Sequence, residues 1–273
     1  MSSVVATVPP VETPATLCCN VREWLAPLDD LATRSTNLIG GILGHFERDG
    51  RRYEIPRYVF VGPQRGDVPI PLGIFAGIYG NEPEGVRALV RFVQLLETQP
   101  ELAAGYCLFL YPACNPTALG TGTPLTASGK DLSLELVRNS NEPEARLLQA
   151  EVAQQPLQGI IRLQTDQNGR TFQGLVRGEP LAEQFLDPAL RAAARFLRDE
   201  DRTNIADFRA RDVSCDHYEG SSLDSSAHPL RPFEVILKSP GAAPVPLRER
   251  AFVVVLRALL QEYRQFIAHA RNL

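Results

Sequence analysis

The chain has 273 residues, of which 44% are hydrophobic, which allows one large domain with a substantial core and excludes disordered and fibrous classes. A net charge of -4 and a pI near 5.7 leave no basic field to attract a polyanion, so we expect no nucleic-acid partner. No apolar run approaches the roughly 20 residues that cross a bilayer, and residues 1–20 lack a secretory signal pattern, so we expect a cytoplasmic protein without a membrane partner.

The first half of the chain contains predicted helices and three predicted strands. Residues 1–20, rich in Pro, Thr and Val, indicate an irregular N-terminal arm. The apolar spacing over residues 21–45 predicts one or two short helices with a break near Ser35. A helical pattern also covers 81–102, and strand patterns bounded by turn residues cover 51–62, 68–80 and 106–116.

The second half alternates helix and strand patterns after a loop rich in Gly, Thr and Ser at 115–130. The periodicity predicts strands at 157–166 and 232–241, and helices at 141–155, 186–200 and 246–270. This alternation predicts an α/β fold with helices on both faces of a mainly parallel or mixed sheet. We expect a single domain over residues 21–273.

Several short segments occur in an order that is typical of a known family. They are YGNEPEG (79–85), NPTALGTGTP (115–124), GKDLSLEL (129–136), IIRLQTD (160–166), GSSLDSSA (220–227) and FEVILKSP (233–240). Together they resemble the zinc carboxypeptidase superfamily, specifically its compact branch related to succinylglutamate desuccinylase and aspartoacylase. The resemblance covers residues from about Tyr53 to the C-terminus and implies a three-layer α/β/α sandwich.

The resemblance implies a zinc site, but most of its ligands are replaced in this chain. Two histidines and a glutamate hold the ion in the family. The matching positions here are Tyr79, Glu82 and Gln164. A phenol with a pKa near 10 stays protonated at neutral pH, and a glutamine offers only a weak carbonyl ligand. Because two of three ligands are lost, we expect the protein to bind no zinc and no other cofactor. The alternative is that it binds zinc through unusual ligands.

The groups that handle the substrate in the family are replaced as well. Pro124 matches the arginine that polarises a carbonyl, and Ser133 and Leu134 match the Asn-Arg pair that grips a carboxylate. Lys238 matches the general-base glutamate, and an ammonium group does not accept a proton from water at neutral pH unless its pKa is strongly lowered. No residue is therefore predicted to be catalytic.

Glu82 has a structural interpretation beside the functional one. At the N-terminus of a helix its carboxylate is stabilised by the first-turn amides, and we hypothesise an ion pair with Lys238 that replaces the charge of zinc. The residues at the two histidine positions would line a binding pocket or fill a vacated one. A weaker alternative is a displaced metal site made by Glu82 with Asp166 and His217.

These replacements predict a degenerate metallocarboxypeptidase-like protein without zinc or catalytic activity. It would bind a small acidic or peptide-like ligand, or a protein, in the former active-site cleft through Tyr79, Glu82, Gln164 and Lys238. The alternative is an active zinc-dependent hydrolase of amide bonds, of carboxypeptidase or desuccinylase/aspartoacylase type, with unusual ligands. The second alternative is a structural or assembly role with the cleft filled. The sequence leaves the oligomeric state open.

Overall fold

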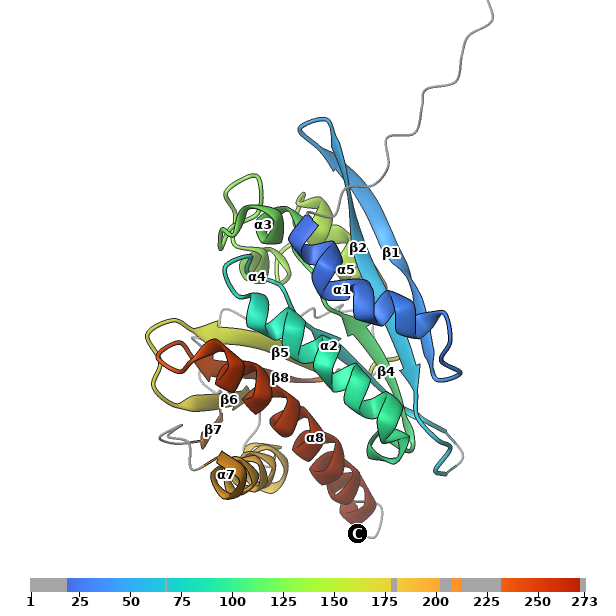
Figure 1. Ribbon diagram of the computed structural model, residues 1–273, viewed down its shortest axis with the longest axis vertical. Helices are drawn as coiled ribbons and strands as arrows, with labels where there is room; N and C mark the ends of the chain where they lie inside the picture. Colours follow the sequence, from blue (N-terminus) through green and yellow to red (C-terminus); the bar gives the residue numbers. More distant parts are fainter. Residues whose placement is uncertain (1–18, 67, 178–180, 202–207, 213–231, 271–273) are drawn as a thin grey trace, which may run out of the picture.

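The computed structural model describes residues 19–66, 68–177, 181–201, 208–212 and 232–270 (Figure 1). Within this part of the chain, eight strands form one mixed sheet in the order β1-β2-β4-β3-β5-β8-β6-β7. The central strands pair in parallel; they are β3 (Ile70–Phe75), β4 (Tyr106–Tyr111), β5 (Gly159–Asp166) and β8 (Phe233–Pro240). The carboxyl ends of these parallel strands therefore lie along one edge of the sheet.

Antiparallel pairs extend this parallel centre on both sides. A hairpin of β1 (Leu38–Arg48) and β2 (Arg51–Val61) joins β4 through β2. On the other side, β6 (Phe172–Val176) is antiparallel to β8 and pairs in parallel with β7 (Phe208–Asp212). The sheet is thus mixed, within the expectation of a mainly parallel or mixed sheet.

Helices cover both faces of the sheet. One face carries α1 (Cys19–Ala32), α2 (Pro83–Thr98), α7 (Asp187–Asp201) and α8 (Val245–Ala270). The opposite face carries α4 (Leu132–Glu135) and α5 (Pro143–Gln154). Figure 1 shows α2 and α8 side by side across the sheet. Three further short helical segments complete the described part: η1 (Pro100–Ala103), α3 (Pro116–Thr121) and the π-helix η2 (Ala182–Leu186).

The two faces have separate apolar cores because strand side chains alternate in direction. On β5, Ile161 and Leu163 belong to the core beneath α2 and α8, whereas Ile160 belongs to the core beneath α5. The same alternation separates Ile74 from Phe75 on β3. These two cores make the protein a three-layer α/β/α sandwich, as the sequence predicts.

The prediction of helix over the whole of residues 21–45 is wrong in its second half. Residues from Leu38 onward form β1, which pairs with β2 along its length, and His45 is an exposed strand residue. The segment contains Gly40, Gly41 and Gly44, which disfavour a helix, while β2 offers backbone partners to ten of its residues, with an irregularity between Ile42 and Gly44. Pro56 lies at the irregular part of this pairing, where β2 has β1 as its partner and has not yet reached β4.

The limits of the predicted arm and of the predicted loop also change. Helix α1 begins at Cys19, so two residues assigned to the arm are helical, and residues 1–18 lie outside the described chain. The loop expected at 115–130 contains the short helix α3. Strands β6 and β7 were not predicted.

Candidate functional site

The four predicted site residues lie at the carboxyl ends of neighbouring strands. Tyr79 and Glu82 follow β3, Gln164 lies near the end of β5, and Lys238 lies near the end of β8. Gln164 and Lys238 are direct partners in the β5–β8 register, so their side chains share a face of the sheet. We call Tyr79, Glu82, Gln164 and Lys238 the strand-end site.

The turn that carries Tyr79 and Glu82 is held by backbone contacts with the chain after β4. The amides of Cys114 and Asn115 donate to the carbonyls of Ala76 and Gly77 at 3.1 and 2.9 Å. Gly80 lies so close to α3 that a Cβ there would come within 2.0 Å of the Ala118 carbonyl oxygen. This position therefore requires glycine for space, which explains the small residue in the YGNEPEG segment.

Glu82 is buried and already has a hydrogen-bond donor. Its Oε2 accepts from the backbone amide of Thr165 at 2.8 Å, and the residue is 7% exposed. Burial raises the pKa of Glu82 to about 7, and the Glu84 carboxylate adds to the increase while the Thr165 amide opposes it. The carboxyl group is therefore protonated in part of the population at neutral pH.

The ion pair hypothesised between Glu82 and Lys238 is wrong. No ion pair joins the two residues in the described part of the chain, and the positive charge of Lys238 lowers the pKa of Glu82 less than the Thr165 amide does. The reason is positional, because Glu82 directs its carboxylate to the backbone at the end of β5. Lys238 lies one strand further along, opposite Gln164 on one side and Gln173 on the other.

Tyr79 is half-buried, and its ring packs against the core beneath α5. Its hydroxyl donates to the Asp131 carboxylate across 3.4 Å. Burial, followed by the negative charge of Asp131, raises the pKa of Tyr79 to about 12. The phenol is therefore neutral throughout the physiological range and is a poor metal ligand.

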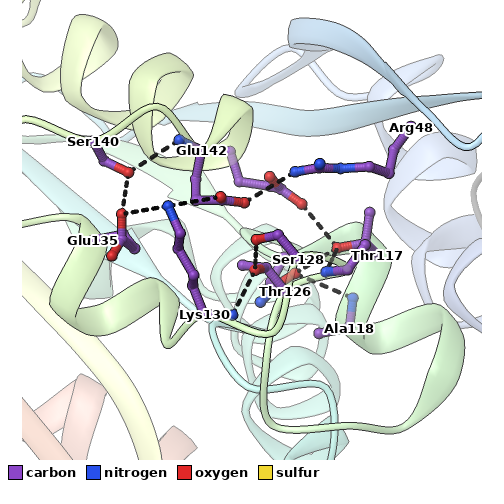
Figure 2. Close-up of polar contacts among 12 residues, drawn as sticks. Arg48, Thr117, Ala118, Thr126, Ser128, Lys130, Glu135, Ser140 and Glu142 are labelled. Carbon is purple, nitrogen blue, oxygen red and sulfur yellow. Dashed lines mark hydrogen bonds and ion pairs between the residues drawn. The ribbon is translucent and has the colours of Figure 1, made fainter.

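Asp131 belongs to a segment that a network of ion pairs fastens to α5 (Figure 2). Lys130 Nζ lies 3.2 Å from Glu142 Oε1, and Arg48 Nη2 lies 3.1 Å from Glu142 Oε2. Burial opposes ionisation of Glu142, but hydrogen bonds from Ser128 and Lys130 and the nearby positive charges lower its pKa overall. The network joins the loop before α4 to the start of α5 and to β1, and so positions the acceptor of Tyr79.

The sequence analysis missed a fully buried arginine beneath the strand-end site. Arg162 on β5 is 0% exposed, forms an ion pair with Glu234 at 2.9 Å and donates to the hydroxyl of Ser133. It lies two residues before Gln164 and shares its face of the sheet. An arginine within the apolar strand segment GIIRLQTD was the available signal, since buried charges are rare without a partner.

A second buried network on the α8 side of the sheet was also missed. Glu84 accepts from the Thr165 hydroxyl and pairs with Arg248, and Thr165 Oγ1 lies 3.0 Å from Ser239 Oγ. These residues come from α2, β5, β8 and α8. The network therefore joins the start of α2, which Glu82 precedes, to the ends of β5 and β8 and to α8. Thr165 serves both glutamates, one through its backbone amide and one through its hydroxyl.

The side chains that the sequence resemblance matches to zinc ligands do not fit zinc. Glu82 is engaged by a backbone amide, Tyr79 remains a neutral phenol, and Gln164 supplies an amide in place of an imidazole. Across the described residues, no group of three or more His, Cys, Asp or Glu side chains is placed to hold a metal ion.

The displaced metal site proposed from the sequence gains no further support. Asp166 closes a turn, because its backbone carbonyl accepts from the amides of Gly169 and Gly241. His217 lies outside the described residues.

Over the part of the chain that the structure describes, no helix is both long and apolar enough to span a membrane.

No protein-family model and no curated protein matches the sequence. Solved structures do match the fold. A protein of Shewanella baltica OS155, provisionally named a metallopeptidase, is 17% identical with a TM-score of 0.66 over 89% of this chain and 92% of its own. A metallo-carboxypeptidase of Burkholderia cenocepacia is 13% identical with a TM-score of 0.66 over 89% of this chain and 68% of its own.

Thrombin activatable fibrinolysis inhibitor is 12% identical with a TM-score of 0.64 and covers 88% of this chain and 73% of its own. At such identities the likeness shows the fold alone. It agrees with the order of the sequence motifs, which predict the same architecture. The chain therefore has the metallocarboxypeptidase-like fold.

Proposed function

We propose that this protein is a degenerate member of the metallocarboxypeptidase-like fold that binds a small acidic or peptide-like ligand at the strand-end site and catalyses no hydrolysis. The observation that carries the proposal is the state of the donors at the zinc position. Glu82 is buried against the Thr165 amide, and Tyr79 is a neutral phenol. A set of this kind favours hydrogen bonding over the binding of a divalent cation.

The chemistry of the strand-end site supports the ligand class. Lys238 supplies a positive charge for a carboxylate, and Gln164 beside it offers both a donor and an acceptor. Glu82, with a pKa of about 7, accepts or donates a hydrogen bond according to its protonation. Carboxylate and amide groups of an acylated amino acid or a peptide terminus match these three functions.

The alternative is an active zinc-dependent hydrolase of amide bonds with unusual ligands. Its support is the fold, because neighbours such as that of Burkholderia cenocepacia are named metallo-carboxypeptidases. The desuccinylase/aspartoacylase branch remains a prediction from the sequence motifs.

Elemental analysis of protein purified from zinc-supplemented medium tests the proposal. We expect far less than one zinc per chain, and no hydrolysis of N-acyl amino acids or carboxypeptidase substrates after zinc is added. Near-stoichiometric zinc that a chelator removes together with amidase activity would establish the hydrolase instead.

Calorimetric titration with N-acetylated amino acids and dipeptides separates ligand binding from a purely structural role. Lys238→Ala should weaken binding about tenfold or more, because a charge-assisted hydrogen bond is lost. Arg51→Ala is the control, since it removes an exposed positive charge at the turn between β1 and β2. No heat with any of these ligands would favour the structural role.

A further inference from the structure

A pocket of about 340 Å³ lies at the end of the sheet opposite the strand-end site. Its walls come from the β2–β3 loop, the start of β3, the turn before β4 and the last turns of α8. Figure 1 shows the C-terminal end of α8 beside the end of α2 and the start of β4. The volume is at the lower end of the range for small-molecule sites.

Two arginines line this pocket, and the structure fixes one of them. Arg264 lies with its guanidinium carbon 5.2 Å from the centroid of the Tyr106 ring and donates to the Leu102 carbonyl at 3.2 Å. The Tyr106 hydroxyl in turn donates to the Leu260 carbonyl at 2.6 Å, so the ring beneath the guanidinium is held in place. A guanidinium held in this way loses little freedom when a ligand binds.

Arg264 still has hydrogen-bonding capacity. Its Nε is buried and has no hydrogen-bond partner in the described part of the chain. The other pocket arginine, Arg65, is exposed on the β2–β3 loop. Neither arginine takes part in an ion pair with a described carboxylate, whereas Arg48, Arg57 and Arg248 all do. Two positive charges therefore face the same pocket without a carboxylate partner among those residues.

The rest of the wall is apolar. Ile70 and Ile267 are partly buried, and Val68 is 76% exposed. An exposed valine beside two arginines gives the pocket a charged part and an apolar part. Guanidinium groups match the two oxygens of a carboxylate in geometry as well as in charge.

We propose that this pocket binds a small organic carboxylate, whose acid group is held by Arg264 and Arg65 and whose apolar body lies against Val68, Ile70 and Ile267. The pocket lies at the amino ends of β3 and β4, while the strand-end site lies at the carboxyl ends of the parallel strands. The proposal is therefore independent of the function proposed for the strand-end site.

Titration of the isotope-labelled full chain with benzoate, followed by NMR, tests the proposal. Saturable shifts are expected for the amide signals of Gly66, Gly105 and Ile267. Benzamide has the same shape without the charge, and inorganic phosphate has the charge without the apolar body. Both should bind about tenfold more weakly or worse than benzoate. Equal affinity for benzamide or for phosphate would overturn the proposal, as would benzoate shifts confined to other regions.

Variants of α8 provide the matched comparison. Arg264→Met should weaken benzoate binding about tenfold or more, and Arg264→Lys should restore part of that loss. Arg257→Met should leave affinity unchanged within about twofold. Arg257 is on the same helix as Arg264, but it lies over the Phe196 ring of α7 and does not line the pocket.

If Arg264→Met does not fold, a substitution that fills the pocket with a large side chain tests the proposal instead. Ala268→Trp changes a residue of the pocket wall that is exposed and leaves both arginines in place. It should abolish benzoate binding while variants of the strand-end site, such as Lys238→Ala, leave that binding intact. Unchanged benzoate affinity in Ala268→Trp would show that the ligand does not occupy this pocket.

Discussion

At the scale of single residues, Glu82 is the group whose chemistry differs most from what the sequence resemblance implies. The resemblance makes it the one retained type of zinc ligand, whereas in the structure its carboxylate accepts from the Thr165 amide and is protonated in part at neutral pH. A glutamate in this state contributes to the pH dependence of folding as well as to any ligand contact.

The first prediction concerns this pH dependence. The pKa of Glu82 is raised from 4.5 to about 7 in the folded protein, so its contribution to stability is fully present below pH 4.5 and is lost as the pH rises to about 7. Glu82→Gln keeps an oxygen for the Thr165 amide and removes the ionisation. The unfolding free energy of the variant, taken relative to that of the wild type, should therefore increase by about 1–3 kcal/mol when the pH is raised from 5 to 8.

Urea denaturation at the two pH values measures this difference. Glu101→Gln serves as the control, because it removes an exposed carboxylate of η1 and should show little change between the two conditions. A Glu82→Gln variant that becomes relatively less stable at pH 8 would contradict the burial argument.

The second prediction restores the missing ligands. Tyr79→His/Gln164→His combines the two imidazoles with Glu82, and should bind zinc about tenfold more tightly, or better, than either single variant. Competition with a chromogenic chelator measures the affinity. Adding Glu82→Gln to the double variant should remove the gain, and an equal gain in one single variant would mean that the three positions do not converge.

At the scale of elements, the turn between β3 and α2 depends on a close approach of two backbones. Gly80 donates to the Thr123 carbonyl at 2.9 Å and faces the Ala118 carbonyl, so that residues before α2 are held against α3. This contact joins the strand end that carries Tyr79 and Glu82 to the segment after β4.

The third prediction tests this approach. Gly80→Ala would place a Cβ 2.0 Å from the Ala118 oxygen, which is backbone and has little freedom to move. We expect a loss of about 2 kcal/mol or more in unfolding free energy, measured by chemical denaturation. Gly41→Ala is the control, since a Cβ at that position meets nothing within 4 Å, and it should change stability by about 0.5 kcal/mol or less.

Element type was predictable where the apolar period was long and lacked competing signals. The period over residues 246–270 predicts α8, and the apolar run at 106–116 predicts β4. The segment that forms β1 was misassigned because its apolar spacing is compatible with either structure, and pairing with β2 decided the outcome. β6 is short, and its pairing with β8 depends on residues far away in the sequence.

At the scale of the whole molecule, two apolar cores and a mixed sheet hold the strand ends in place. The fourth prediction follows from this arrangement and from the proposed absence of zinc. Dialysis against a chelator should change the thermal midpoint by less than about 1 °C, because a ligand stabilises a protein only where it binds the folded state.

Differential scanning calorimetry with and without zinc measures this effect. The double variant Tyr79→His/Gln164→His provides the positive control, since its midpoint should rise with added zinc. A wild-type midpoint that falls after chelation and recovers with zinc would contradict the metal-free proposal.

The sequence by itself determined that strands and helices alternate in an α/β fold, because hydrophobic period is a local property. The resemblance of its motifs to the zinc carboxypeptidase superfamily implied the three-layer sandwich and the replacement of zinc ligands by Tyr79 and Gln164. Only the tertiary structure decided the partners of those residues. Glu82 accepts a hydrogen bond from the Thr165 amide and forms no ion pair with Lys238, and Arg264 lines a pocket. All three features depend on distances between segments that are remote in the chain.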